Sequence, residues 1–285
     1  MRSPRVWPLP DLGIWLRRGQ VAIVLPAVFL SVQASWSAET PTGWREEVRT
    51  MRAGDFPPPP DHMGMNYVFG WSGIEAAEAR TTLRRGADGL WTGTVSGGTK
   101  GWVRTLWKLD ADYRTEVSEM DWKSLRMRLT ENYRSYRTDE KSEFLPGGVR
   151  SWRESTKSGA KKPKWKNFYV DGIRDIAGAL FLGRSQPLRD GAVIRLAVFP
   201  GEWMYLVTAR VEGREKIAWR GSDRPVIRAS LGIESIGKDY SLEPHQKFQR
   251  GTVWISDDAL RIPLRIEVKV FIGYVFAELV DVKTE

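Results

Sequence analysis

Acidic side chains in the second half of the chain offer the first candidates for chemistry. Asp257 and Asp258 are adjacent, and the fold could bring further carboxylates beside them, namely Asp190, Glu202 and Asp239. Such a group could bind Ca²⁺ or supply a general acid and base. No known ligand spacing supports the site, however, and Asp side chains commonly accept hydrogen bonds from backbone N–H groups in turns. We therefore interpret Ser256, Asp257 and Asp258 as a structural turn and predict no metal site.

The sequence offers little evidence for a catalytic nucleophile. Ser158 and Lys161 match the Ser-x-x-Lys pattern that pairs a nucleophile with a base in serine acyltransferases. The companion Ser-Asp-Asn and Lys-Thr-Gly motifs are missing, and the match lies in a Gly- and Lys-rich stretch. The chain has no Cys, which excludes thiolate sites and disulfides, and its only histidines are His62 and His245. We predict no catalytic residue and no cofactor.

The densest basic segment of the chain is flanked by two indoles. It comprises Arg150, Arg153, Lys157, Lys161, Lys162, Lys164 and Lys166, with Trp152 and Trp165 at its flanks. Cations beside indoles could contact anionic lipid or polysaccharide. The alternative is a solvated hairpin loop whose two Trp side chains face the sheet. The candidate ligand-binding residues are Trp152, Trp165, Lys161, Lys162 and Lys164.

Tryptophan is unusually frequent, with 14 residues. Indoles could line a groove that stacks on sugars or receives acyl chains. They could equally fill the core of a β-rich domain, which is the commoner role.

The elements that would position these side chains are mostly strands. Residues 264–270 alternate strictly between apolar and charged, which is typical of a half-buried antiparallel strand. Gly273 permits a turn, and residues 274–282 supply the second strand of a hairpin. Residues 125–134 form another strand with a basic outer face, and the other face carries Leu125, Met127, Leu129, Glu131 and Tyr133.

Two short helices complete the pattern. Apolar residues at helical spacing predict a helix from about Thr99 to Leu109, although a strand is the alternative there. Asp171 is a candidate N-cap for a second helix that ends near Gly183. With 27 Gly and 16 Pro, the chain is predicted to be mainly β (α+β). We expect a curved antiparallel sheet or partial barrel of roughly nine to eleven strands with two short helices.

The N-terminus has the pattern of an export signal. Arg17 and Arg18 precede an apolar segment, residues 21–32, which is too short to span a bilayer at about 1.5 Å per residue. We interpret residues 1–38 as a signal peptide; a single anchoring helix is the alternative. Residues 39–62 are expected to be a Pro-rich N-terminal tether, and residues 63–285 a single β-rich domain.

Cleavage of the signal fixes the expected compartment and charge. Without Cys the chain lacks the lipid-bearing residue of a lipoprotein, so a periplasmic or secreted protein with no transmembrane segment is predicted. Four Arg and one Asp leave with the signal, which lowers the formal net charge from +9 to +6. A basic chain favours anionic partners, here lipid or polysaccharide of the envelope, whereas export disfavours nucleic acid.

Three stretches together resemble an exported bacterial family known as domain of unknown function 3108. They are residues 66–77, residues 171–191 and, as the most specific part, residues 254–279, which contain Trp-Ile-Ser-Asp-Asp followed by Arg-Ile-Pro-Leu-Arg. The first stretch departs from the family, because Glu75-Ala76-Ala77 stands where a glycine-containing turn is expected. The resemblance implies export but supplies no activity and no catalytic residues. By analogy of fold alone, the family's pattern of an antiparallel sheet with helices is similar to the half-barrels of periplasmic lipoprotein carriers.

These observations favour a non-enzymatic envelope protein, a periplasmic binding or carrier module for a lipid-like or glycan ligand. The alternatives are an envelope hydrolase or transferase that uses carboxylates, and a structural component of the envelope.

Overall fold

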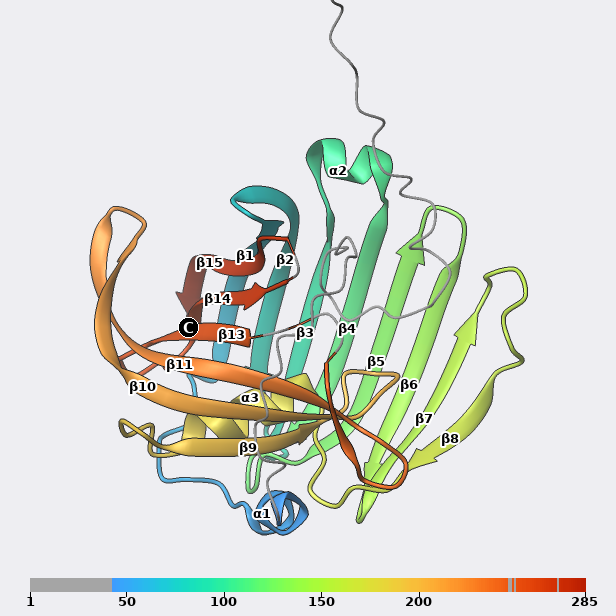
Figure 1. The fold of residues 1–285 in the computed structure, drawn as a ribbon, viewed down its shortest axis with the longest axis horizontal. Helices are drawn as coiled ribbons and strands as arrows, with labels where there is room; N and C mark the ends of the chain where they lie inside the picture. The colour runs from blue at the N-terminus through green and yellow to red at the C-terminus, as the bar shows by residue number, and fades with distance from the viewer. Residues whose placement is uncertain (1–42, 246–247, 249, 271) are drawn as a thin grey trace, which may run out of the picture.

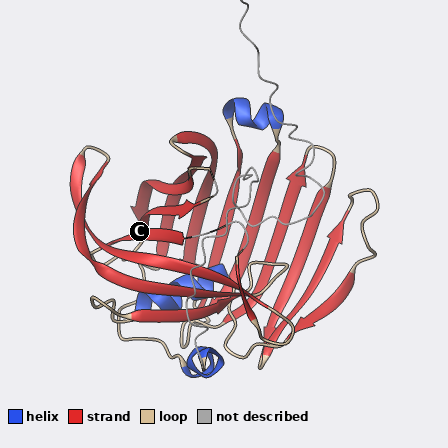
Figure 2. Cartoon of the chain, in the orientation of Figure 1, coloured by secondary structure: helices blue, strands red, loops and turns tan. Residues whose placement is uncertain are grey.

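The computed structural model describes residues 43–245, 248, 250–270 and 272–285, so the signal peptide predicted for residues 1–38 lies outside the described residues. Within these ranges the chain forms three helices and fifteen strands (Figure 1, Figure 2). In chain order they are α1 (Trp44–Thr50), β1 (His62–Trp71), β2 (Ile74–Arg85), β3 (Leu90–Thr99), α2 (Gly101–Leu106), β4 (Leu109–Ser118), β5 (Ser124–Tyr133), β6 (Arg137–Leu145), β7 (Gly148–Ser155), β8 (Lys164–Phe168), α3 (Ile176–Ser185), β9 (Val193–Val198), β10 (Tyr205–Trp219), β11 (Ser222–Ile236), β12 (Leu242–Pro244), β13 (Arg250–Ser256), β14 (Pro263–Lys269) and β15 (Tyr274–Thr284).

All these strands belong to one antiparallel sheet. Its order is β8-β7-β6-β5-β4-β3-β2-β1-β15-β14-β13-β11-β10-β9, and β12 pairs with β11. The sheet therefore consists of two meanders that join where β15 pairs with β1. Strands β8 and β9 are its two edges. Figure 1 shows the sheet curving so that β9, β10 and β11 pass across the face of the first meander.

Hydrophobic packing closes the interior that the curvature creates. Phe199 and Leu206, from the β9–β10 side, share one buried core with Met127 and Leu129 of β5 and Val149 of β7. No hydrogen-bonded ladder between β8 and β9 is present among the described strands. The partial barrel is thus held together by apolar burial, which is worth about 1.5–3 kcal/mol for a fully buried Leu or Phe side chain.

Helix α3 plugs one end of this interior. Phe181 and Leu182 pack on Trp91 of β3 and Val117 of β4. The N-cap is Asp175, fully buried, whose carboxylate accepts hydrogen bonds from the Gly178 N–H at 2.8 Å and from three hydroxyl groups, those of Tyr113, Thr115 and Ser124.

The prediction that Asp171 is the N-cap of this helix was wrong. Gly172 has a left-handed φ of +78°, Arg174 forms an isolated bridge with Val198, and Asp175 is still extended. The helix begins only after that bridge.

The segment expected to be a tether over residues 39–62 is packed on the domain from Gly43 onward. Trp44 and Val48 of α1 are buried in the main core. The Gly54 N–H donates to Ser185 Oγ at 3.0 Å. The Phe56 ring lies under the guanidinium of Arg261 at 3.5 Å. The four prolines prevent regular secondary structure, but burial of apolar surface from the Trp44 and Phe56 rings attaches the segment to the domain.

The fifteen strands exceed the roughly nine to eleven predicted, and there are three helices among the described residues instead of two. Short elements account for much of this: β12 has three residues and is too short to show alternation. The mainly β class, the antiparallel sheet and the helix near residues 99–109 are confirmed. The hairpin of β14 and β15 is also present, with Gly273 at φ +78° in its turn.

Candidate binding groove and acidic cluster

The inward face of β1–β4 forms a small apolar groove beyond the closed core. Ala79, Gly97 and Ala111 are direct partners across β2, β3 and β4, so they make a row of small side chains on the groove floor. Phe69 and Trp107 also line the groove, whose cavity volume is about 60 Å³. A Cβ atom at Gly97 would lie 2.6 Å from the Ala79 Cβ, so glycine is required for this close packing.

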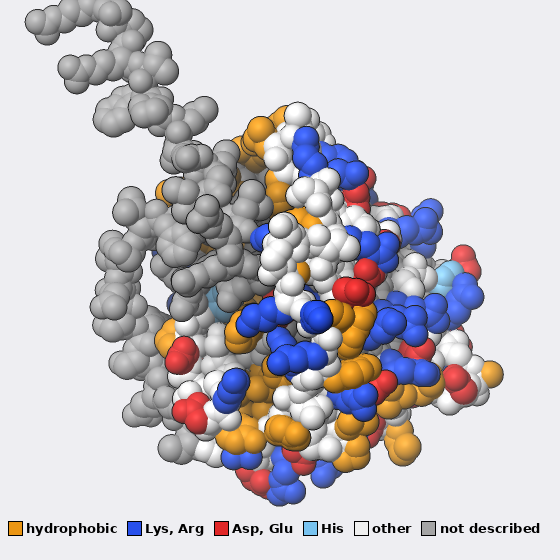
Figure 3. Space-filling view, turned by 90° about the vertical axis from the view of Figure 1, so that its right-hand side faces the viewer, with side chains coloured by type: hydrophobic (Ala, Val, Ile, Leu, Met, Phe, Trp, Pro, Cys, Tyr) orange, Lys and Arg blue, Asp and Glu red, His pale blue; other side chains and the backbone are white. Residues whose placement is uncertain are grey.

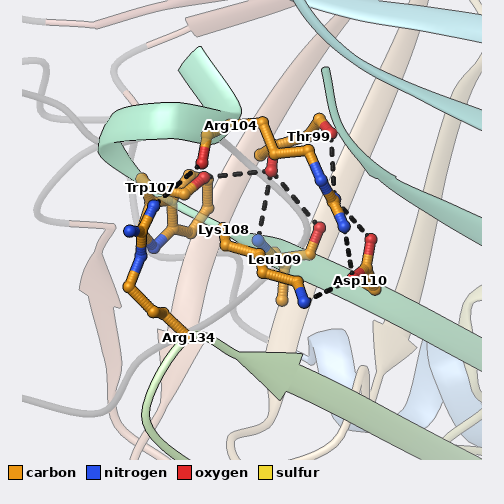
Figure 4. A network of polar contacts seen from close by, with 7 residues as sticks. All are labelled: Thr99, Arg104, Trp107, Lys108, Leu109, Asp110 and Arg134. Atoms are coloured by element: carbon orange, nitrogen blue, oxygen red, sulfur yellow. Dashed lines mark hydrogen bonds and ion pairs between the residues drawn. The ribbon is translucent and has the colours of Figure 1, made fainter. Parts of the chain in front are cut away.

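A polar network fixes α2, and with it Trp107, at the open end of the groove (Figure 4). The Arg104 guanidinium donates to both Asp110 oxygens, at 2.6 and 2.9 Å, and thereby lowers the pKa of that carboxyl. The Thr99 hydroxyl donates to the Trp107 carbonyl at 2.9 Å and accepts from the Leu109 N–H at 3.1 Å. Helix α2 is too short to be stable alone, so these bonds position it.

Beside the groove, the inward face becomes charged. Glu131 of β5 is the direct partner of Ala111 on the groove floor. Glu140 of β6 pairs in register with Arg153 of β7. The Arg153 guanidinium lies 3.1 Å from Glu202, in the β9–β10 connection, 3.5 Å from Glu140 and 3.9 Å from Glu131. We call Glu131, Glu140, Glu202 and Arg153 the acidic cluster.

The acidic cluster is buried and incompletely bonded. Glu131 is 1% exposed and Glu140 is 2% exposed. Glu140 Oε1 accepts hydrogen bonds from Ser142 at 3.3 Å and Ser151 at 3.2 Å. Glu140 Oε2 and both Glu131 oxygens accept none from any described residue, although burying a polar atom without a partner is costly. The backbone of Gly201 covers Glu140, because a Cβ there would lie 3.0 Å from its carboxylate.

Burial controls the protonation of these acids. It raises the pKa of Glu131 to about 7 and that of Glu140 to about 7, while the Arg153 charge opposes both shifts. The Tyr133 hydroxyl is close enough to Glu131 to lower its pKa slightly, but it makes no hydrogen bond of good geometry. The Tyr133 ring stacks on Tyr136 at 4.3 Å, and Lys157 lies over Tyr136 at 5.3 Å.

A second cleft, of about 270 Å³, lies on the opposite face of the sheet, along β1, β14 and β15. It is lined by residues of both charges, among them Glu75, Arg220, Arg265 and Glu278. The Arg265 guanidinium already forms an ion pair with the Glu267 carboxylate at 2.5 Å. This mixture gives the cleft no clear preference for one class of ligand.

The structure brings together only part of the predicted basic site. Trp152 and Trp165 are direct partners across β7 and β8 and lie on the outward face. Their rings are covered by Lys141, at 5.1 Å from Trp152, and Arg150, at 4.1 Å from Trp165. On this side of the molecule, Lys and Arg side chains alternate with hydrophobic ones (Figure 3).

The predicted lysines lie apart from this indole pair. Lys161 and Lys162 are exposed in the β7–β8 loop. Lys164 is the direct partner of Arg153, so its position belongs to the inward register and is opposite to the two indoles.

The carboxylates singled out from the sequence do not gather. Asp258 accepts hydrogen bonds from Leu260 N–H at 2.9 Å and Arg261 N–H at 3.2 Å, as in a turn. Ser256 Oγ accepts from the Ile262 N–H, and Asp257 lies 3.2 Å from Arg214, which also holds Asp190. Asp239 bonds to Ser241. Across the described residues, no group of three metal-ligating side chains is placed to hold an ion.

Sequence reasoning missed the acidic cluster, although a signal for it existed. Glu131 is in phase with Met127 and Leu129 on the apolar face of its strand. A carboxylate at such a position is expected to be buried, but only the fold shows that Glu140 and Glu202 join it.

A known protein family matches most of the chain. The profile of the family described as protein of unknown function DUF3108 matches residues 66–280. The chain belongs to this family. No curated protein matches the chain. This member of DUF3108 contains no helix, within its described residues, that is long and apolar enough to cross a membrane.

One of three similar solved structures shares the fold. A β-barrel-like protein of domain of unknown function DUF1849 from Brucella abortus is similar with a TM-score of 0.53 and 11% identity, over 80% of this chain and 99% of that one. A protein from Bacteroides fragilis, described as a candidate exported protein with a YmcC-like fold, has a TM-score of 0.34 and 6% identity over 81% and 100% of the two chains. The hypothetical lipoprotein YmcC from Escherichia coli has a TM-score of 0.29 and 8% identity over 83% and 88%. The first similarity shows a shared β-barrel-like fold and nothing further.

Proposed function

We propose that this DUF3108 protein is a non-enzymatic binding or carrier module of the cell envelope, and that its groove holds the apolar chain of a lipid-like ligand. The observation that carries the proposal is the row of Ala79, Gly97 and Ala111 on the inward face, bordered by the rings of Phe69 and Trp107. The export signal predicted in residues 1–38 supports a periplasmic location.

The groove favours an alkyl chain over a glycan. Its volume of about 60 Å³ gives room for a short stretch of a narrow alkyl chain and excludes a sugar ring. Sugars need hydrogen-bonding partners. The Thr99 hydroxyl, which lines the groove, is already used by Trp107 and Leu109.

The outward face of β7 and β8 supports a contact with anionic lipid or polysaccharide. Trp152 and Trp165 form a cross-strand pair there, with Arg150 and Lys141 over the rings. Indoles beside cations are typical of surfaces that lie against anionic headgroups. Lys161 and Lys162 in the adjacent loop would add to the attraction. A hydrolase built on Asp257 and Asp258 is disfavoured, because the Asp258 side chain is bonded within the turn and the Asp257 side chain is paired with Arg214.

Filling the groove tests the proposal. An Ala111→Phe variant places a ring on the groove floor, whereas Ala218→Phe makes the same change at an exposed position of β10. The wild type and Ala218→Phe should bind dodecanol in a titration followed by tryptophan fluorescence, and Ala111→Phe should bind it at least about tenfold more weakly. Absence of binding by the wild type, or equal binding by all three proteins, would refute the groove as a ligand site. Circular dichroism confirms that the variants are folded.

A further inference from the structure

The acidic cluster carries more negative charge than its surroundings balance. Three carboxylates share one guanidinium, that of Arg153, and two of them, Glu131 and Glu140, are almost completely buried. Both Glu131 oxygens and Glu140 Oε2 accept no hydrogen bond from the described residues. Buried charges are normally paired, so this arrangement lacks a cation or a hydrogen-bond donor.

The cluster lies directly beside the groove. Glu131 is the cross-strand partner of Ala111, so their side chains are neighbours on one face of the sheet, about 5 Å apart at their Cβ atoms. A molecule whose chain lies on the Ala111 row would therefore bring its head group to Glu131. Chain and head would occupy one continuous surface, apolar over β2–β4 and acidic over β5–β7.

An ammonium group matches what the cluster offers. It presents three N–H donors, and three oxygens of Glu131 and Glu140 accept no hydrogen bond from the described residues. The stacked rings of Tyr133 and Tyr136 provide a π surface close to Glu131, which favours an organic cation. A divalent metal fits less well, since no three metal-ligating side chains among the described residues are placed so that they could hold one ion.

We propose that the acidic cluster is the head-group site for a cationic amphiphile, in which Glu131 and Glu140 bind a primary ammonium while its alkyl chain lies in the groove. This inference rests on the proposed function and narrows its ligand class to amine-bearing lipids. Because Glu131 is 1% exposed, binding requires a shift of the side chains that cover it.

The charged and titratable groups around the site fix the expected pH dependence. They are Glu131 and Tyr133 of β5, Tyr136 of the β5–β6 turn, Glu140 of β6, Arg153 of β7, Lys157 beyond β7, Lys164 at the edge strand, and Glu202 with Tyr205 from the β9–β10 side. The glutamates lose their protons near pH 7, whereas an alkylammonium keeps its charge to about pH 10, as Lys does. Affinity should therefore rise between pH 5.5 and pH 8.

The test compares three amphiphiles with one chain length: dodecylamine, dodecanol and dodecyl sulfate, each below its critical micelle concentration. Binding is followed by calorimetry and by tryptophan fluorescence. The chain has a net charge of +9, so non-specific attraction favours the sulfate. We expect the amine to bind at least about tenfold more tightly than the alcohol, and Glu131→Gln and Glu140→Gln each to reduce that preference several-fold. Glu143→Gln, on the exposed face of β6, is the charge-matched control and should change nothing.

The outcomes separate the two proposals. If all three amphiphiles bind wild type and Glu131→Gln alike, the head-group site is refuted and the groove stands. If the amine preference survives in both Gln variants, the cluster does not bind the ammonium and the inference is again refuted. If no amphiphile binds the wild type, the inference and the proposed function fail together.

Discussion

The two faces of β6 and β7 hold charged residues in opposite physical states. Glu140 and Arg153 point inward and are cross-strand partners within the buried acidic cluster. One residue along each strand, Lys141 and Trp152 are partners on the outward face, where the ammonium lies 5.1 Å over the indole. The two pairs lie on opposite faces only because successive side chains of a β-strand point to opposite sides of the sheet.

The difference shows that a charge affects the stability of the fold strongly only where water is excluded. Inward, burial raises the pKa of Glu140 to about 7 and makes its few partners indispensable. On the outward face, solvent screens Lys141 and Arg150, so their contribution to stability is small. Their proposed role is to attract anionic lipid or polysaccharide.

Removing the one guanidinium of the cluster is expected to give the largest effect. Arg153→Met leaves Glu131, Glu140 and Glu202 without a counter-charge, so we expect a loss of about 3–5 kcal/mol in the free energy of unfolding near pH 8. Arg150→Met, on the outward face, should cost less than about 1 kcal/mol. Urea unfolding measures both. Equal losses would show that the two faces do not differ.

Between pH 5 and pH 8, a change of pH should act on stability mainly through the inward face. In the folded state Glu131 and Glu140 have pKa values of about 7, against the usual 4.5, so the folded protein binds more protons between these values. The stability that these two acids contribute should therefore be complete below about pH 4.5 and be lost as the pH rises to 7 and above. The fall is on the order of 3 kcal/mol for each acid, before their mutual coupling is counted.

Urea midpoints at pH 5 and pH 8 measure this slope. The double variant Glu131→Gln with Glu140→Gln should flatten it, and Glu143→Gln on the exposed face should leave it unchanged. A wild-type midpoint that is the same at both pH values would contradict the assigned burial of the two acids.

The sequence predicts the face of a residue better than it predicts its neighbours. Strict alternation in residues 264–270 and 125–134 correctly indicated antiparallel strands, and Gly273 correctly marked a turn. These signals are local, because the backbone imposes the period and glycine adopts the left-handed φ most readily. The indole pair of Trp152 and Trp165 also follows locally, from one hairpin.

The candidate site needed information that no local pattern contains. Glu202 reaches Arg153 only because the sheet curves and brings the β9–β10 connection over β6 and β7. The row of Ala79, Gly97 and Ala111 depends on the registers of three strands, and a shift by one residue would move each side chain to the other face. The packing of residues 43–61 was missed because the buried Trp44 ring and the half-buried Phe56 ring contact elements far along the chain.

The smallest expected effect on stability belongs to the outward indoles, and it sharpens the comparison. Trp165 is 41% exposed, so Trp165→Ala should cost only about 1 kcal/mol or less in the free energy of unfolding. The same variant, alone or with Lys161→Ala and Lys162→Ala, should bind vesicles of anionic lipid several-fold more weakly, and salt should weaken what remains. Glu131→Gln should bind these vesicles like the wild type. Sedimentation with vesicles of anionic and of zwitterionic lipid measures the difference. If Trp165→Ala destabilised the fold strongly while leaving vesicle binding intact, the outward face would be part of the core structure and not a contact surface.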